Sequence, residues 1–272
     1  MNKYNNVIGG FGISMGYTLL YLSLIVIIPL STVLLSAMSM SWGDFLATVL
    51  DRRALLSYKV TILASLTAAF VNLIIGFIMA WVLTRYEFWG KSIINAAVDL
   101  PFALPTAVAG ITLTALYAES GWIGSILAKV GIKVIFTQTG IALALIFITF
   151  PFVVRTVQPA LEELESELEE AAASLGASRI QTLTKVIFPI IAPSLITGFA
   201  LAFARGLGEY GSVIFISGNM PFKTEITPLL IITKLEQFNY AAANALALMT
   251  LLTAFTVLFF LGVLKKFIRR EQ

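Results

Sequence analysis

Three ionisable side chains stand inside apolar stretches of the chain. Asp99 opens the segment DLPFALPT, and Arg205 and Glu209 lie four residues apart in ARGLGEYG. A charge inside a membrane is costly, so it usually pairs with another charge or lines a water-filled path. Two interpretations are open: buried ion pairs that fix helix packing, or a pore lining that meets a charged solute. Arg205 can pair with Glu209 on one face of a regular helix, and Asp99 is a second possible partner.

Prolines and glycines near these charges indicate interrupted helices. Pro101 and Pro105 follow Asp99, and glycines occupy positions 206, 208 and 211, where a break would remove the face shared by Arg205 and Glu209. Irregular backbone at membrane depth is tolerated where it is buried in protein or lines a cavity. Freed backbone N–H groups at helix ends favour anions. We therefore predict an anion path lined by Asp99, Thr106, Arg205 and Glu209.

Several kinds of chemistry are excluded by residue type. The chain has no histidine and no cysteine, which excludes thiol nucleophiles, Ser-His-Asp triads and Cys/His metal sites. Residues 206–211 match G-x-G-x-x-G, but that pattern binds dinucleotides only between a strand and a helix. The net charge of +3 is too small and too dispersed to indicate nucleic acid. We predict no catalytic residue, no metal and no cofactor on this chain.

A polar segment from Leu161 to Pro193 separates two long apolar stretches. One helix face is predicted by the 3- and 4-residue spacing of Leu161, Leu164, Leu168, Ala172 and Leu175. Six glutamates, at 162, 163, 165, 167, 169 and 170, cover the rest of that helix, most of them as a solvated face.

A turn is predicted within this polar segment. Gly176 can end the first helix in the left-handed conformation, and a second helix begins near Ala177 or Ser178, carrying Arg179 and Lys185 toward the membrane. Alanines at 171–173 would let another surface approach the backbone closely. From the residues alone, a docking element and a plain helix–turn–helix both remain open.

The composition places most of the chain in a membrane. Of its 272 residues, 58% are hydrophobic and 12% charged, and the mean hydropathy is +0.92; soluble domains carry about 25% charged residues. A spanning helix needs about 20 predominantly apolar residues. Six stretches qualify: 15–38, 60–84, 92–117, 139–157, 187–204 extending toward 216, and 241–264. We read the first as a retained span rather than a signal peptide.

The distribution of Lys and Arg gives the orientation. The side that holds both ends of the chain has ten of these cations, against seven on the other side, and residues 265–270 form its strongest cluster. We predict a bacterial inner-membrane protein with a cytoplasmic N-terminal segment 1–14, a transmembrane domain 15–264 and a basic cytoplasmic tail 265–272. The polar segment, about 158–186, also faces the cytoplasm.

The polar segment resembles the EAA loop of permease subunits in bacterial ABC importers. The resemblance rests on Glu170-Ala171-Ala172, on Gly176 six residues after the glutamate, and on Phe188-Pro189. It implies an all-α type I permease fold of about six transmembrane helices. It also implies that this loop lies in a groove of a cytoplasmic ATPase, with contacts from Glu170, Ala171, Ala172, Ala173, Ser174, Leu175, Gly176, Ala177, Ser178 and Arg179.

A second resemblance concerns the solute. Residues 204–230, with the run GNMPFKTE at 218–225, are similar to the CysT type of the sulfate/thiosulfate permease family. This implies a partner permease of the CysW type, two copies of an ATPase that binds ATP and Mg²⁺, and an external sulfate- or thiosulfate-binding protein. Besides these proteins, the chain would contact membrane lipid.

Three other functions remain as alternatives. A molybdate or tungstate permease would differ mainly in the size of its dianion. A secondary anion transporter or channel would need no ATPase. A membrane-embedded enzyme would need converging catalytic groups, which a chain lacking His and Cys does not offer.

Overall fold

The computed structural model describes residues 10–270, and that part of the chain is helical with no strand. Helices α1 to α4 cover Phe11–Leu22, Ile28–Met38, Trp42–Val49 and Arg52–Arg85, with a π-helical turn at Ser23–Ile27. Helices α5 to α9 cover Lys91–Val98, Leu100–Ala103, Thr106–Tyr117, Gly124–Lys129 and Gln138–Glu162. Helices α10 to α15 cover Ser166–Ser174, Arg179–Thr182, Phe188–Leu207, Gly211–Ser217, Thr227–Glu236 and Tyr240–Arg270, with a second π-helical turn at Leu183–Ile187.

Five helices in the described range are long and apolar enough to cross a membrane: Phe11–Met38, Arg52–Arg85, Gln138–Glu162, Arg179–Leu207 and Tyr240–Phe267. They match five of the six predicted spans. The remaining one, 92–117, is divided into α5, α6 and α7. Pro105 causes the second break, because a residue before proline avoids the helical region and Leu104 is extended at φ −86° and ψ 135°.

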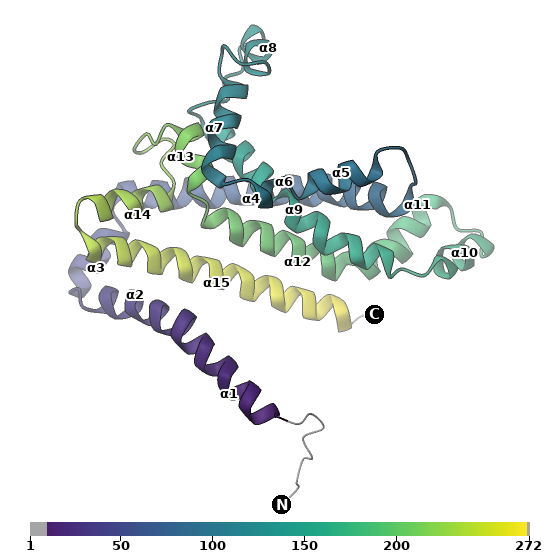
Figure 1. Ribbon diagram of the computed structural model, residues 1–272, viewed down its shortest axis with the longest axis horizontal. Helices are drawn as coiled ribbons and strands as arrows, with labels where there is room; N and C mark the ends of the chain where they lie inside the picture. Colours follow the sequence, from purple (N-terminus) through teal and green to yellow (C-terminus); the bar gives the residue numbers. More distant parts are fainter. Residues whose placement is uncertain (1–9, 271–272) are drawn as a thin grey trace, which may run out of the picture.

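Helices α4, α9 and α12 form the centre of the molecule and pack along most of their lengths (Figure 1). Their contacts bury Ala69, Ala80, Val153, Val154 and Phe203. Gly76 of α4 has no side chain because a Cβ there would lie 2.9 Å from the side chain of Val153. Close packing of this kind holds the three helices as one rigid unit.

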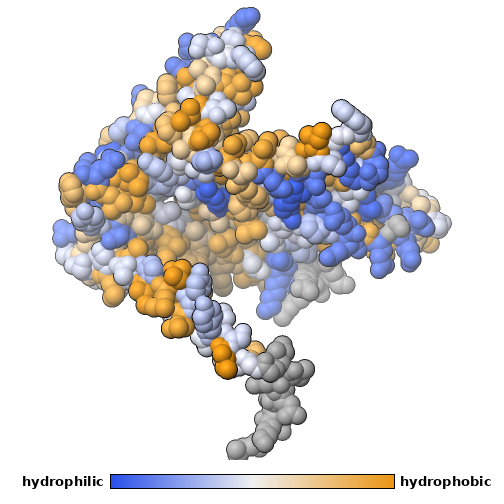
Figure 2. Space-filling model, in the orientation of Figure 1, coloured by the Kyte–Doolittle hydropathy of each residue, from blue (hydrophilic) through white to orange (hydrophobic). Residues whose placement is uncertain are grey.

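The long N-terminal helix is only partly attached to this centre. Its second half, α2, packs along α15, where the side-chain amide of Asn244 donates to Ser36 at 2.7 Å. The first half, α1, diverges from the body (Figure 1) and has no buried residue. Figure 2 shows hydrophobic residues on the visible surface of the N-terminal helix. Such a surface is expected to contact lipid or another subunit.

The two ends of the helical body carry different segments. Helices α10 and α11 lie at one end, and α3, α14 and the start of α4 lie at the other (Figure 1). Hydrophilic residues gather over the α10–α11 end in Figure 2. The segment predicted as a tail continues α15 as a helix to Arg270, with Lys265 donating to Thr197 at 2.9 Å. Residues 1–9 of the predicted N-terminal segment, and residues 271–272, lie outside the described range.

Helix α7 leaves the body at a steep angle and is attached through α13 (Figure 1). The attachment requires glycine at two positions. A Cβ on Gly110 would lie 2.8 Å from the Cα of Ser212, and a Cβ on Gly211 would collide with the hydroxyl of Thr106. These glycines therefore set the distance between the two helices.

We predict that Gly110→Ala destabilises the protein, because the new methyl group must push α7 away from the backbone of Ser212. Overpacking of this kind costs about 1–3 kcal/mol. Thermal unfolding of the detergent-purified protein measures the loss. Gly208→Ala is the matched control, since a Cβ there meets nothing within 4 Å; equal stability of both variants would contradict the close-packing argument.

Candidate functional site

Arg205 and Glu209 form an ion pair where α12 ends. The break comes at Gly208, and the guanidinium of Arg205 still lies 2.7 Å from Glu209. The other carboxylate oxygen of Glu209 accepts from the backbone N–H and the hydroxyl of Ser212, at 2.9 and 3.0 Å. Glu209 thus caps α13 as well as pairing with Arg205. Its side chain is 1% exposed while that of Arg205 is 35% exposed, so the arginine is the member of the pair that a solute can reach.

Thr106 of α7 lies beside the break between α12 and α13. It is the first residue of α7, and its hydroxyl lies against Gly211 at the start of α13. Three of the four predicted path residues therefore come from one place in the fold. Two glycines of the G-x-G-x-x-G pattern serve packing: Gly206 faces Ser65 of α4, and Gly211 faces Thr106.

Asp99, the fourth predicted path residue, has a different partner. Its two carboxylate oxygens accept from Arg155 of α9, at 2.8 and 2.7 Å. Arg155 also donates to the side chain and the carbonyl of Asn95, and to Gln158. The expectation that Asp99 is a second partner for Arg205 is therefore replaced by an Asp99–Arg155 pair, which fixes α5 and α6 against α9.

Arg155 is not among the functional residues predicted from the sequence. The structure places it inside α9, which continues to Glu162. A signal was present in the sequence: Arg155 stands in PFVVRTV, within an apolar run. An arginine in such a run requires a partner, and Asp99 is one of the carboxylates that the sequence offers upstream.

The polar segment forms the predicted turn. Helix α10 ends at Ser174, and Gly176 adopts φ +79°. The N–H of Ala177 donates to the carbonyl of Ala172 at 3.0 Å, and that of Gly176 to Ala173 at 2.9 Å; this pair of hydrogen bonds is the Schellman ending of a helix. Helix α11 then begins with a capping box between Ser178 and Gln181. Both helix ends are satisfied locally, so the turn holds its shape without a partner.

The predicted single helix face of the polar segment is corrected in one respect. Leu161 belongs to α9, and residues 163–165 separate it from α10. Leu161, Leu164 and Ala172 are buried, whereas Leu175 is 88% and Ile180 73% exposed. Two apolar side chains therefore flank Gly176 at the tip of a hydrophilic end of the molecule. These two exposed apolar side chains make the turn a candidate contact surface.

The end of α4 attaches this turn to the helical body. Arg85 lies 2.5 Å from the carboxylate of Glu169 in α10 and sits over the ring of Trp81, 5.6 Å from its centroid. Glu169 of α10 thus forms an ion pair with the helical body. Trp81 and Glu169 also line a cavity of about 400 Å³ between α4, α10 and α11, together with Ala173, Ala177, Arg179, Thr182, Leu183 and Ile187.

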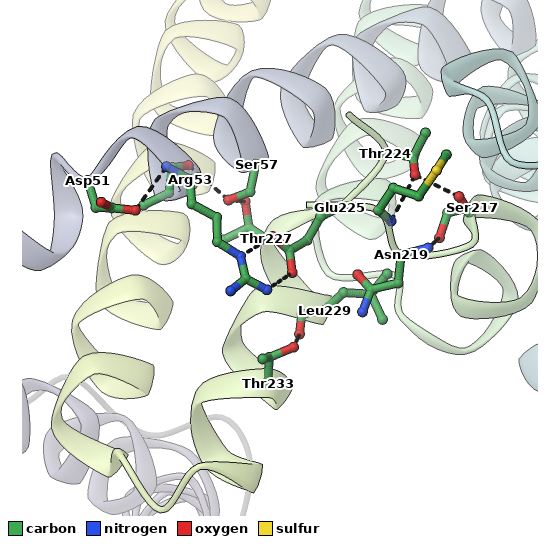
Figure 3. A network of polar contacts seen from close by, with 12 residues as sticks. Asp51, Arg53, Ser57, Ser217, Asn219, Thr224, Glu225, Thr227, Leu229 and Thr233 are labelled. Carbon is green, nitrogen blue, oxygen red and sulfur yellow. Dashed lines mark hydrogen bonds and ion pairs between the residues drawn. The ribbon is translucent and has the colours of Figure 1, made fainter. Parts of the chain in front are cut away.

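A polar network at the opposite end of α4 was not predicted (Figure 3). Arg53 donates through Nε and Nη2 to the two oxygens of Glu225, both at 2.6 Å. Beside it, Thr61 accepts from the backbone N–H of Thr227 at 2.8 Å. Arg53 and Glu225 are 172 positions apart in the chain, so their pairing has no signature in local spacing.

The loop that carries Glu225 is fixed at both ends. The hydroxyl of Thr224 donates to the carbonyl of Ser217 at 2.7 Å and accepts from the N–H of Met220 at 3.1 Å. Figure 3 shows these contacts beside the Arg53–Glu225 pair. Pro221, Phe222 and Lys223 remain exposed beyond them. The hydrogen-bonded part of the loop therefore holds residues 221–223 as a short exposed tip.

Comparison with known proteins identifies the family. A model described as "Binding-protein-dependent transport system inner membrane component" matches residues 72–271. The chain belongs to this family. As a member of it, the chain is a multi-pass membrane protein and the permease component of an ABC importer.

Relatives and solved structures agree with this assignment. The chain is 48% identical over 95% of its length to the sulfate transport system permease protein CysT of Salmonella typhimurium, covering 94% of that protein. It is 47% identical over 95% of its length to the CysT protein of Escherichia coli, again covering 94%. In fold it is similar to a chain of a bacterial alginate ABC transporter, with a TM-score of 0.77, 15% identity and 94% of both chains covered.

We predict that Arg155→Lys loosens the broken third span of this permease. Lysine keeps the charge but cannot reproduce the two-pronged contact with Asp99 and the bonds to Asn95. Losing one charge-assisted hydrogen bond costs about 1.5–3 kcal/mol, so amides of residues 91–105 should exchange hydrogen roughly tenfold faster. Mass spectrometry of the purified protein measures this exchange. The exposed Arg52→Lys serves as control, and unchanged exchange in Arg155→Lys would contradict the clamp.

Proposed function

We propose that this family member is the permease subunit of an ATP-driven sulfate importer and forms half of its translocation path. The observation that carries the proposal is the identity of 47–48% to two CysT sulfate permeases across 95% of the chain. Residues 218–225, which carried the resemblance to this branch, form the loop fixed by Glu225. Thiosulfate is included as a second solute of the same charge.

The partners follow from the two ends of the molecule. The α10–α11 turn, with exposed Leu175 and Ile180, contacts a cytoplasmic ATPase through residues 170–179. The tip at 221–223 faces an external binding protein. A second permease of the CysW type completes the path, and two ATPase copies bind and hydrolyse ATP with Mg²⁺. The chain itself performs no covalent chemistry, and both of its ends lie in the cytoplasm.

The anion path passes the α12–α13 break. Arg205 offers a partly exposed guanidinium whose charge is balanced by the buried Glu209. A balanced cation can contact a dianion without trapping it, because the net charge of the pair is zero. Thr106, at the start of α7, adds a hydroxyl beside it. Asp99 serves the path indirectly, by holding α5 and α6 in place through Arg155.

Uptake of radiolabelled sulfate into cells that carry this chain with its partner subunits tests the solute. We expect ATP-dependent uptake that excess unlabelled sulfate or thiosulfate suppresses and that molybdate suppresses weakly. Strong suppression by molybdate alone would make the chain a molybdate permease. Uptake that follows an ion gradient and persists without any ATPase would make it a secondary transporter.

Gly176→Asp tests the coupling turn. Aspartate has a Cβ and a charge, so it disfavours the φ of +79° that the turn requires, by about 1–2 kcal/mol, and changes the surface between Leu175 and Ile180. We expect normal membrane insertion with uptake reduced to background. Gly90→Asp is the control, because Gly90 also has positive φ and open space around its Cα but lies in the α4–α5 connection. Normal uptake by Gly176→Asp would contradict ATPase docking at this turn.

A further inference from the structure

One helix connects the two surfaces that face the proposed partners. Helix α4 runs from Arg52 to Arg85 without interruption, which is about 50 Å at 1.5 Å per residue. It contains no proline, and its single glycine, Gly76, is packed against α9. A helix supported in this way has none of the usual causes of a kink. It therefore moves as a rigid rod.

At each end of α4 an arginine forms an ion pair with the segment that carries one of the two surfaces, the α10–α11 turn or the outer loop. At the inner end Arg85 reaches Glu169, at the centre of the helix that leads into the α10–α11 turn. At the outer end Arg53 holds both oxygens of Glu225, at the base of the loop that presents residues 221–223. Figure 3 shows the guanidinium and the carboxylate facing one another edge to edge.

The Arg53–Glu225 contact at the outer end of α4 has a restricted geometry. The side chain of Glu225 is 1% exposed and that of Arg53 is 25% exposed. A two-pronged contact between guanidinium and carboxylate restricts both distance and angle. Asp51 holds the other side of Arg53, by accepting from its backbone N–H at 2.9 Å. Thr61 and Thr227 add a further bond about two helical turns inward, so the loop cannot shift without moving α4.

We propose that Arg53 and Glu225 are positioning residues that couple the outer loop to the ATPase-facing turn through α4. This inference rests on the proposed function. When an external binding protein engages the loop, the Arg53–Glu225 contact transfers its displacement to α4, and Arg85 transfers it to α10. Coupling between two binding events is reciprocal, so ATPase closure at the turn also changes the position of the outer loop.

A purely structural clamp would give different results, which makes the two roles separable. Breaking a buried pair by removing one partner destabilises a protein, whereas replacing both partners by neutral residues of similar size is often tolerated. The double variant Arg53→Met/Glu225→Gln therefore preserves folding and removes the charge-assisted contact. Arg53→Lys is the milder variant, since it keeps the charge and loses the two-pronged geometry. Glu119→Gln, at the exposed Lys133–Glu119 pair, is the control for loss of one outer charge.

The test uses the complete transporter in proteoliposomes, with ATP hydrolysis measured as the external sulfate-binding protein is added. We expect both Arg53 variants to keep the basal rate and the half-saturating concentration of binding protein. Their maximal stimulation should fall at least about fivefold, the lower end of typical coupling between sites. Glu119→Gln should be stimulated like the unaltered transporter.

Three outcomes overturn the inference. Full stimulation of well-folded variants would show that the contact does not couple the two surfaces. A raised half-saturating concentration with an unchanged maximum would assign it to docking alone. An unaltered transporter that the binding protein fails to stimulate would contradict the proposed function together with the inference, whereas the first two outcomes leave the proposed function intact.

The two ends of α4 can also be tested against each other. If one rod carries the signal, a lesion at either end interrupts the same step, and residues that act through one element are not additive. We expect Arg85→Lys to lower maximal stimulation, and Arg53→Lys with Arg85→Lys to lower it no further than the stronger single variant. Multiplied effects in the double variant would place the two contacts on separate routes and contradict transmission through α4.

Discussion

The structure depends on the pairing of charges among its helices. Four arginines, at 53, 85, 155 and 205, each meet a carboxylate from another segment, or from beyond the end of the same helix. A charge without such a partner would be expensive in an apolar surrounding. Because each pair joins two segments, satisfying the charges also fixes the outer loop, the inner turn, the broken third span and the α12–α13 break.

These pairs divide the molecule into a rigid centre and attached functional segments. The centre is apolar and closely packed around α4, α9 and α12. The segments that carry exposed residues, such as the α10–α11 turn, are short and depend on local caps for their shape. Rigid helices can transmit motion, and locally capped turns can present a fixed surface to a partner. A permease of an ABC importer works with a substrate-binding protein and an ATPase, and contact with both needs both properties.

Much of this arrangement was predictable where the signal is local. Membrane helices are evident from hydropathy, and Gly176 was expected to end a helix because glycine tolerates positive φ; both predictions are confirmed. The third span was predicted to be interrupted because of Pro101 and Pro105, and this prediction is confirmed. Its division into α5, α6 and α7 follows from Pro105 together with the Asp99–Arg155 contact. Only the effect of Pro105 is visible in the local sequence.

The sequence by itself determined the approximate place of five long spans, the capped turn and the family, because each depends on residue type over a short stretch. The Arg205–Glu209 pair was predictable from its four-residue spacing, but the tertiary structure alone decided which distant charges meet. Arg53 finds Glu225 172 residues away, and Arg155 finds Asp99 56 residues away, so no periodicity or spacing relates them. The partners are selected by how the apolar helices pack, and the charges then make that packing specific.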